Sequence, residues 1–292
     1  MPSSSNPRGL DHLVIAVRDL DAAGAFYERL GFTVGTRNRH PWGTENRIVQ
    51  FPGSFLELVT VADAAAIPPH GQRSFSFGAF LHDALARQGE GLSMLVLEGQ
   101  DAQAEAAAFR ADGIGDFEPF FFERQGRRPD GSTVRVAFEL AFAADPQAPE
   151  CGFFTCRQLE PQNFWNPDFQ SHPNGTTALA GAIMLAEDPA LHRAFLTAFS
   201  GGAAVLEGNA DYIVALPRGR IDVLDPEAAQ AAYQIGPDTT PARFLGFCVA
   251  VPDLAAIADR LESAGLPFIQ NEERVFVAAE DAMGCLIAFE PA

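Results

Sequence analysis

The sequence predicts an α+β fold built from four βαβββ units that form two pairs. A strand, a helix and three further strands recur four times along the 292 residues. Residues 47–61 align with residues 212–226 without a gap, so the first and third units share one pattern. A polar segment at 160–177 separates the first two units from the last two. With 47% hydrophobic residues, the chain can bury a sizeable core.

The first unit occupies residues 10–61. Its opening stretch reads as a strand, and the helix that follows has Asp19 or Asp21 as its N-cap and Gly31 as its stop. Apolar runs bounded by turn residues then predict three more strands. These runs cover residues 32–37, 46–52 and 54–61.

The second unit repeats the pattern. Its first strand is expected at 91–99, and its helix from near Asp101 to near Gly113. The stretch at 67–90 reads as a linker between the first two units. The remaining strands of the second unit are expected at 117–123, 133–143 and 152–159.

The third and fourth units complete the chain. The third opens with a strand at 179–189 and a helix over about 190–199, on which His192 is expected to be exposed. The fourth opens with a strand at 244–254, and its helix ends near Gly265. The other strands of these units are expected at 203–208, 211–217, 220–226, 274–279 and 284–291. The expected domains are an N-terminal pair at 8–159, a linker at 160–177 and a C-terminal pair at 178–292.

The charge of the chain argues against several classes of function. It has 20 basic and 38 acidic residues, for a net charge of −18. Phosphate backbones and anionic membranes attract basic surfaces, so neither nucleic acid nor a membrane is an expected partner. Every basic residue is arginine, and without lysine neither Schiff-base chemistry nor a Walker-type phosphate loop is available. The opening residues lack an apolar signal core, so a cytoplasmic location is expected.

Two polar side chains interrupt strands that otherwise read as core. His12 lies among leucine, isoleucine and valine, and Glu57 lies within FLELV. Burying such groups is costly unless they are paired or bound to a metal. Two interpretations follow. The residues hold a metal ion, or they pair with each other or with backbone groups in a polar pocket.

The stretch LDHLVIAVRDLDAAGAFYERLGFTV, followed by HPWGTENRIVQFPGSFLELV, resembles the glyoxalase-like domain branch of the vicinal oxygen chelate (VOC) superfamily. That superfamily includes glyoxalase I and the extradiol dioxygenases. The resemblance implies that each pair of units forms a cupped mixed β-sheet flanked by helices, with a divalent metal ion inside the cup. Its ligands come from the first and last strands of a unit. These positions fall on His12 and Glu57, and the ion would be Zn, Fe, Ni, Mn or Mg, with a metal-free cup as the alternative.

The other units depart from this pattern. In the second unit the ligand positions fall on Met94 and Cys156, of which Cys156 could bind a softer metal as a thiolate. A buried cysteine is more often a small hydrophobe. The corresponding residues of the third and fourth units are Gly181 with Asp222, and Gly246 with Ala288. The C-terminal pair is therefore expected to serve packing and assembly.

Residues elsewhere could complete a site. His172, in the segment at 160–177, is a candidate third ligand. The resembling branch has a histidine followed by Gly-Thr-x-Asn where this chain has HPWGTEN, which implies that His40 is a proton carrier; a polar hairpin is the alternative. Glu139 would be a base if it faced inward, and would otherwise form a cross-sheet salt bridge. Substrate contacts are expected from Trp42, Thr44, Asn46, Phe154 and Gln158.

The leading functional hypothesis is a metal-dependent, glyoxalase-like lyase or isomerase. It would chelate neighbouring oxygens of a small organic substrate and stabilise the charge that develops on them. One rival is a metal-free protein that binds or sequesters a small molecule, as in drug resistance. Another is a relative of the ring-cleaving dioxygenases, although a two-histidine, one-carboxylate iron site is incomplete here. The four units could pair with one another within a single chain, and a homodimer is the alternative.

Overall fold

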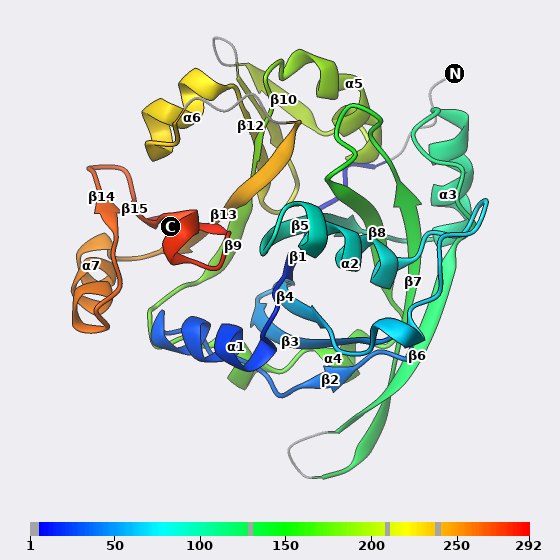
Figure 1. Ribbon diagram of the computed structural model, residues 1–292, viewed down its shortest axis with the longest axis horizontal. Coiled ribbons are helices and arrows are strands. Elements are labelled where there is room, and N and C mark those ends of the chain that lie inside the picture. Colours follow the sequence, from blue (N-terminus) through cyan, green and yellow to red (C-terminus); the bar gives the residue numbers. More distant parts are fainter. Residues whose placement is uncertain (1–5, 128–130, 208–210, 237–240) are drawn as a thin grey trace.

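The computed structural model describes residues 6–127, 131–207, 211–236 and 241–292. Within these residues lie two eight-stranded mixed sheets with helices packed around them (Figure 1). The strands of the first sheet come from residues 10–158, and those of the second from residues 178–291. The predicted α+β fold with two paired sheets is therefore confirmed.

Two βαβββ modules build the first sheet, whose strand order is β2-β3-β4-β1-β5-β8-β7-β6. β1 and β5 lie antiparallel at its centre, and the last strand of each module runs parallel to the first. The sheet curls, which gives it a concave face (Figure 1). The first module contains β1 (Leu10–Ala16), α1 (Leu20–Arg29), β2 (Asn38–Arg39), β3 (Thr44–Phe51) and β4 (Ser54–Val61). The second contains β5 (Gly91–Glu98), α3 (Ala102–Ala111), β6 (Phe120–Arg127), β7 (Thr133–Ala143) and β8 (Gly152–Gln158).

The second sheet repeats this topology, with the order β10-β11-β12-β9-β13-β16-β15-β14. β9 and β13 meet antiparallel, with β12 and β16 parallel beside them. The end of the strand predicted at 203–208, Gly208, lies outside the described residues. The third module contains β9 (Ala178–Leu185), α5 (Ala190–Phe199), β10 (Ala204–Glu207), β11 (Tyr212–Ala215) and β12 (Arg220–Leu224). The fourth contains β13 (Arg243–Val251), α7 (Leu254–Ser263), β14 (Ile269–Gln270), β15 (Val275–Val277) and β16 (Leu286–Pro291).

Two local predictions were wrong. The stretch at 67–90 is not only a linker, because it contains α2 (Phe77–Arg87), which Ser76 caps and which buries Phe77, Leu81 and Leu85. The strand predicted at 32–37 does not form, and the short β2, which pairs with β3, begins just after it. Phe32 turns into the core, and the N–H of Gly35 donates to the carbonyl of Ile48 on β3 at 2.8 Å. Shorter helices are α4 (Pro161–Phe164), α6 (Pro226–Tyr233) and the 3₁₀ turns at Ala64–Ala66, Pro167–Gln170 and Ala279–Asp281.

One hydrophobic core runs through both sheets. It takes in side chains from α1, α3, α5 and α7 and from the faces of the sheets that these helices cover. Phe153 of β8 illustrates the continuity. Its ring lies 4.7 Å from that of Phe195 on α5 and 5.6 Å from that of Phe244 on β13, measured between centroids. The two halves of the chain thus share their interior.

His192 belongs to this interior, and the expectation that it is exposed was wrong. Its Nδ1 lies 2.7 Å from Oδ2 of Asp145, and both side chains are 3% exposed. The histidine shares a face of α5 with Phe195 and Phe199, three and seven residues on, and both rings pack into the shared core. The face that carries His192 is therefore turned inward.

The concave faces of the two sheets differ in what covers them. In the second sheet α6 lies over the concave face, where Ala229 and Tyr233 pack against Cys248, Phe276 and Ala288. The first sheet has α2 in the corresponding place after its fourth strand, but this helix leaves a cavity beneath it, with Phe77 at its wall. The candidate site lies in that cavity.

Candidate functional site

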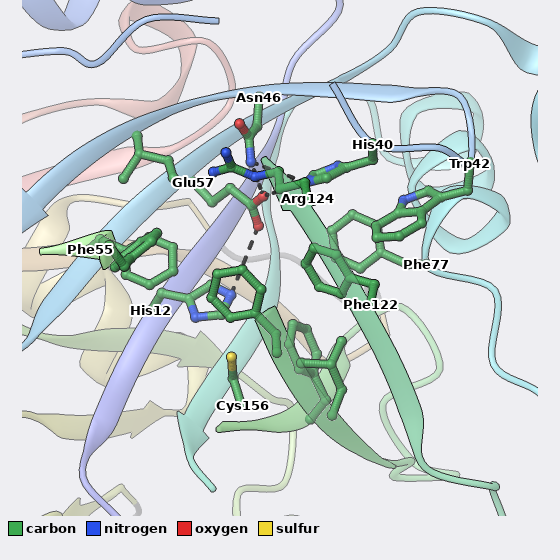
Figure 2. A pocket seen from close by; sticks show the side chains of 15 residues that line it. His12, His40, Trp42, Asn46, Phe55, Glu57, Phe77, Phe122, Arg124 and Cys156 are labelled. Atoms are coloured by element: carbon green, nitrogen blue, oxygen red, sulfur yellow. Dashed lines mark hydrogen bonds and ion pairs between the residues drawn. The ribbon is translucent and has the colours of Figure 1, made fainter. Parts of the chain in front are cut away.

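The cavity has a volume of about 50 Å³ and opens in the concave face of the first sheet (Figure 2). Most of its wall is apolar, so a polar ligand group would meet few competing waters. The rings and aliphatic side chains come from Trp42, Ile48, Phe55, Phe77, Phe122, Phe138, Leu140, Phe154 and Phe164. The polar lining consists of His12, His40, Asn46, Glu57, Arg124 and Cys156.

His12 projects from β1 into the cavity because it shares the concave face with Val14 and Ala16. A register shift in the pairing with β5 lies between Leu10 and His12, at Asp11. The Asp11 Oδ1 lies 2.5 Å from Nδ1 of His12. Burial raises the pKa of Asp11, and the hydrogen bond from His12 opposes that rise. The other nitrogen of His12, Nε2, is left facing the cavity.

Glu57 on β4 faces His12 across the cavity. Its Oε2 lies 3.9 Å from Nε2 of His12, too far for a hydrogen bond (Figure 2). The ring of His12 is held in this orientation by stacking on Phe55, with 4.2 Å between centroids. The other carboxylate oxygen, Oε1, accepts a hydrogen bond from Nδ2 of Asn46. The structure therefore brings together the two residues predicted to hold a metal.

His40 is fixed by a short hydrogen-bonded chain. Its Nδ1 lies 2.8 Å from Oγ1 of Thr44, and its Nε2 lies 3.3 Å from Nδ2 of Asn46 and 3.7 Å from Oε1 of Glu57. Asn46 accepts from Nδ2 of Asn38, so its own amide group donates toward Glu57 and His40. Burial lowers the pKa of His40. Together these contacts favour a neutral ring with its proton on Nδ1 and a lone pair on Nε2.

Aromatic side chains predicted to touch the substrate line the same space. Trp42 stacks on His40 at 4.7 Å, and its buried Nε1 has no hydrogen-bond partner among the described residues. Phe154 presents its edge to His12 at 5.5 Å. Both residues line the cavity. Thr44 lies behind His40, where its hydroxyl group holds that ring by a hydrogen bond, and it does not line the cavity.

Cys156 and Gln158 lie beyond His12. Ligand atoms of Asp11, His12 and Cys156 lie within 4.8 Å of one another, which makes them a second group able to approach a metal. Burial raises the pKa of the Cys156 thiol well above its ordinary value of 9.0. Gln158 Nε2 donates to Oδ2 of Asp11 at 3.4 Å, so Gln158 supports Asp11 and does not line the cavity.

Two predicted site residues lie elsewhere. Glu139 faces away from the cavity and pairs with Arg157 at 3.2 Å, which is the cross-sheet salt bridge offered as its alternative role. His172 lies against Phe51 on the opposite face of the sheet. Its Nε2 donates to the carbonyl of Gln50 at 2.9 Å, and its Nδ1 accepts from the N–H of Thr33 at 3.0 Å. With both nitrogens used, His172 joins the 160–177 segment to the first module.

Arg124 lines the cavity, and the sequence alone did not single it out. It projects from β6 on the same face as Phe120 and Phe122 and reaches the cavity beside Glu57 (Figure 2). Burial lowers its pKa, and the nearby charge of Glu57 opposes that effect. The strand predicted at 117–123 stopped one residue short of it. Extending the alternation of that strand by one residue would have placed Arg124 inside the cup.

Strand register shows which residues of the modules occupy corresponding positions. His12 lies opposite Phe55 in β1 and β4, and Gly181 lies opposite Arg220 in β9 and β12, as the alignment of the first and third units requires. In the second module Val96 lies opposite Phe154. If Cys156 corresponds to Glu57, the counterpart of His12 is therefore Val96 and not Met94. Neither valine nor methionine is a ligand for a hard cation, so the second module has no metal ligand at the position of His12.

In the third module an arginine side chain, that of Arg220, lies where the first module has its candidate metal-binding pair. Arg220 donates through Nε to Asp222, the counterpart of Glu57, at 2.8 Å, and through Nη2 to Glu290 at 2.7 Å. A Cβ atom at Gly181, the counterpart of His12, would come within 2.8 Å of Cγ of Arg220. Any side chain at residue 181 would therefore clash with Arg220 in its present position.

The fold and the first-sheet cavity define a protein of the VOC superfamily. Residues 10–200 match the family described as glyoxalase-like domain, which is more than half of the chain. The protein belongs to this glyoxalase-like domain family. A search of curated proteins finds no match to the sequence.

Solved structures support the fold. A hypothetical protein from Staphylococcus aureus has 11% identity and a TM-score of 0.67, over 98% of this chain and 99% of that one. A fusion of a xylose isomerase-like TIM barrel with 4-hydroxyphenylpyruvate dioxygenase has 15% identity and a TM-score of 0.54, over 100% of this chain and 50% of that one. A mutant of 4-hydroxymandelate synthase from Streptomyces coelicolor has 9% identity and a TM-score of 0.52, over 97% and 92%.

None of the helices in the described ranges is both long enough and apolar enough to cross a membrane.

Proposed function

We propose that this protein is a metal-assisted enzyme of the VOC type, in which His12 and Glu57 hold a divalent cation. One observation carries the proposal: Nε2 of His12 and Oε2 of Glu57 face each other at 3.9 Å across a small cavity. Two metal–ligand bonds of about 2.1 Å at a tetrahedral angle place their donor atoms about 3.4 Å apart, so a small inward movement of either side chain would bring both donors onto one ion. The donor pair fits Zn, Fe, Ni or Mn, with the remaining positions open to substrate and water.

Asp11 supports this assignment from outside the ligand pair. Metal-binding histidines commonly donate their second ring N–H to a carboxylate, which fixes the ring and raises its basicity. Asp11 occupies that place at 2.5 Å from Nδ1 of His12. The group formed by Asp11, His12 and Cys156 is less suitable, because an ion on Nδ1 would break this contact and because Cys156 is held as a neutral thiol.

We assign proton transfer to His40. A bound cation would act as a Lewis acid on substrate oxygens. His40 is neutral, carries a lone pair on Nε2 and lies on the Glu57 side of the cavity, so it can accept a proton from a substrate group there and return it to a neighbouring atom. The surrounding rings exclude water, which protects the transferred proton from exchange. This arrangement favours a lyase or isomerase.

A metal-free binding protein is the second candidate, and a specific observation favours it. Arg124 and the Asn46 amide already lie beside Glu57, so its charge is partly compensated without a cation. A dioxygenase related to the solved neighbours would need a third protein ligand. His40 stands nearest to Glu57 but contacts the other carboxylate oxygen.

Metal titration of protein purified without a histidine tag and treated with a chelator tests the proposal. We expect calorimetry to show uptake of one equivalent of Mn²⁺ or Zn²⁺. The His12→Ala and Glu57→Gln variants should each lose at least about tenfold in affinity. His82→Ala is the matched control, because His82 is a half-exposed histidine on α2. No uptake by the wild-type protein, or unchanged uptake by H12A, would reject the site.

A further inference from the structure

We infer that the natural ligand of this cavity is a small carboxylic acid with an apolar body, and that Arg124 binds its carboxylate. The inference deepens the proposed function by naming a class of substrate, and it rests on that function only for the chemistry that follows binding. Three features carry it: the state of the Arg124 side chain, its place between two cavities, and the apolar wall around it.

Arg124 differs from the other arginines whose side chains the structure describes. Each of those has a hydrogen bond, an ion pair or a ring contact, for example Arg37 with Asp21 and Arg47 with the same carboxylate. Within the described residues Arg124 has no hydrogen bond and no carboxylate oxygen within 4.0 Å, although its side chain is largely withdrawn from water. A charge withdrawn from water without a partner is costly, and a guanidinium stays protonated in proteins. Glu57 offsets part of this charge from a distance, and the donors of the guanidinium remain open to an anion that enters the cavity.

Within the described residues no ion pair joins Glu57 to Arg124, although the two charges lie near each other. Its Oε1 accepts from Asn46, and its Oε2 faces His12. The planar fork of a guanidinium matches a carboxylate through two parallel N–H donors, and neither Asn46 nor His40 can offer this. The charge of Arg124 thus remains available on the cavity side.

The position of Arg124 also suits a ligand that enters from outside. A second cavity of about 390 Å³ lies between β3, β6 and the 160–177 segment, and its lining is mainly polar. Ile48, Arg124 and Phe164 line both cavities, so Arg124 stands where the polar space meets the ring-lined space. An acid could be held there by its carboxylate while its body packs among the rings.

Apolar walls define the rest of the ligand. Phe55, Phe77 and Phe154 surround the inner cavity, and no residue in the described ranges pairs with the buried Nε1 of Trp42. A sugar or a polyphosphate would leave many polar groups unpaired against such walls. An aromatic or branched aliphatic acid would instead bury its apolar surface against these rings. Its carboxylate oxygens would accept hydrogen bonds from Arg124.

Phenylacetate and its neutral isostere phenylacetamide test the inference. Calorimetric titration of the wild-type protein should show at least about tenfold tighter binding of the acid, because a charge-assisted hydrogen bond is worth about that factor. Arg124→Gln should abolish the preference by weakening the acid alone. The matched control is Arg135→Gln, which removes an exposed arginine from the neighbouring strand and should keep the preference. The inference is overturned if the wild type binds the acid and the amide equally or binds neither. It is also overturned if the preference for the acid survives R124Q.

Measurements on metal-loaded and on chelator-treated protein separate this inference from the proposed function. If a metal held the carboxylate, the preference would vanish on chelation and survive R124Q, and the role of Arg124 would be rejected. If no metal binds at all, the metal site fails, while the acid preference of the chelated protein still decides the role of Arg124. Circular dichroism melts verify that the variants fold. Should R124Q unfold, Arg124→Met and the wild-type comparison of acid with amide decide the role of Arg124 in its place.

Discussion

Asp11 and His12 are consecutive residues whose side chains meet at 2.5 Å, Oδ1 to Nδ1, at a register shift in the pairing of β1 with β5. Consecutive residues of a regular strand would point to opposite faces. The irregularity therefore allows a carboxylate to stand behind the histidine on the same side of the sheet. It decides which ring nitrogen faces Glu57.

Replacing Asp11 by asparagine should weaken metal binding by about 10–100-fold, because the ring of His12 loses both its orientation and its enhanced basicity. Calorimetric metal titration measures the change. Asp83→Asn is the matched control, since Asp83 also neighbours a histidine in sequence, His82, but on an exposed face of α2. An unchanged affinity in D11N would reject the supporting role of Asp11 behind His12.

Cys156→Ala should leave metal uptake intact. The thiol is buried and its pKa is raised, so it serves as a small apolar side chain, and its removal should cost about 1 kcal/mol of stability. Calorimetry and urea denaturation measure the two properties on the same sample. Loss of metal uptake without loss of fold would make Cys156 a ligand and reject its assignment as lining.

His40 should remain neutral at pH values where an ordinary histidine is half protonated, because burial lowers its pKa from 6.5. Long-range ¹⁵N NMR should find the proton on Nδ1 and none on Nε2 at pH 6.5. A protonated ring at that pH would contradict the assignment of His40 as proton acceptor.

The lowered pKa of His40 also predicts how the stability of the protein depends on pH. The pKa of His172 is also lowered, by burial. Below pH 6.5 the unfolded chain binds protons that the folded protein does not accept, so the free energy of unfolding should fall as the pH drops from 6.5 through the folded-state values. Urea denaturation at pH 7.5 and 5.5 measures the difference. His172→Gln should reduce the slope, and an unchanged slope would exclude a contribution from that residue.

Arg220→Ala should destabilise the C-terminal half. It leaves the carboxylates of Asp222 and Glu290 close together and largely buried, at a cost of about 3 kcal/mol. The loss should shrink at low pH, where the carboxyls are protonated. Arg135→Ala removes an arginine that also bridges two carboxylates, but on the surface, and should change the melting temperature little. Equal effects of the two substitutions would show that the Arg220 bridge is not structural.

Much of the fold followed from the sequence because repeats and alternation are local signals. His12 and Glu57 could be singled out since each breaks an apolar strand. Asp11 could not, because its position depends on a register shift between strands that are far apart in the chain, with Leu10 opposite Leu97 on one side of it and His12 opposite Val96 on the other. The register between two paired strands cannot be predicted from the sequence of either strand alone.

Errors at the site had physical causes of the same kind. His172 reads like a free loop histidine, yet both nitrogens are used by backbone groups of β3 and Thr33, which only the folded chain brings near. Arg124 was not identified because the predicted strand ended at residue 123, four residues before the end of β6 at Arg127, and strand ends are the least certain part of any pattern. α2 was missed because its short apolar face lies between turn-forming stretches.

The shared interior determines where this chain could be cut. The rings of Phe109 and Phe153, from the half that carries the cavity, pack against Phe195 and Phe199 of α5. A fragment ending at the 160–177 segment would expose those rings to water and would tend to aggregate. The family match extends to residue 200, just past the end of α5 at Phe199. A truncated form meant to keep the cavity folded should therefore be sought beyond α5, and a sheet of this protein is not by itself a folding unit.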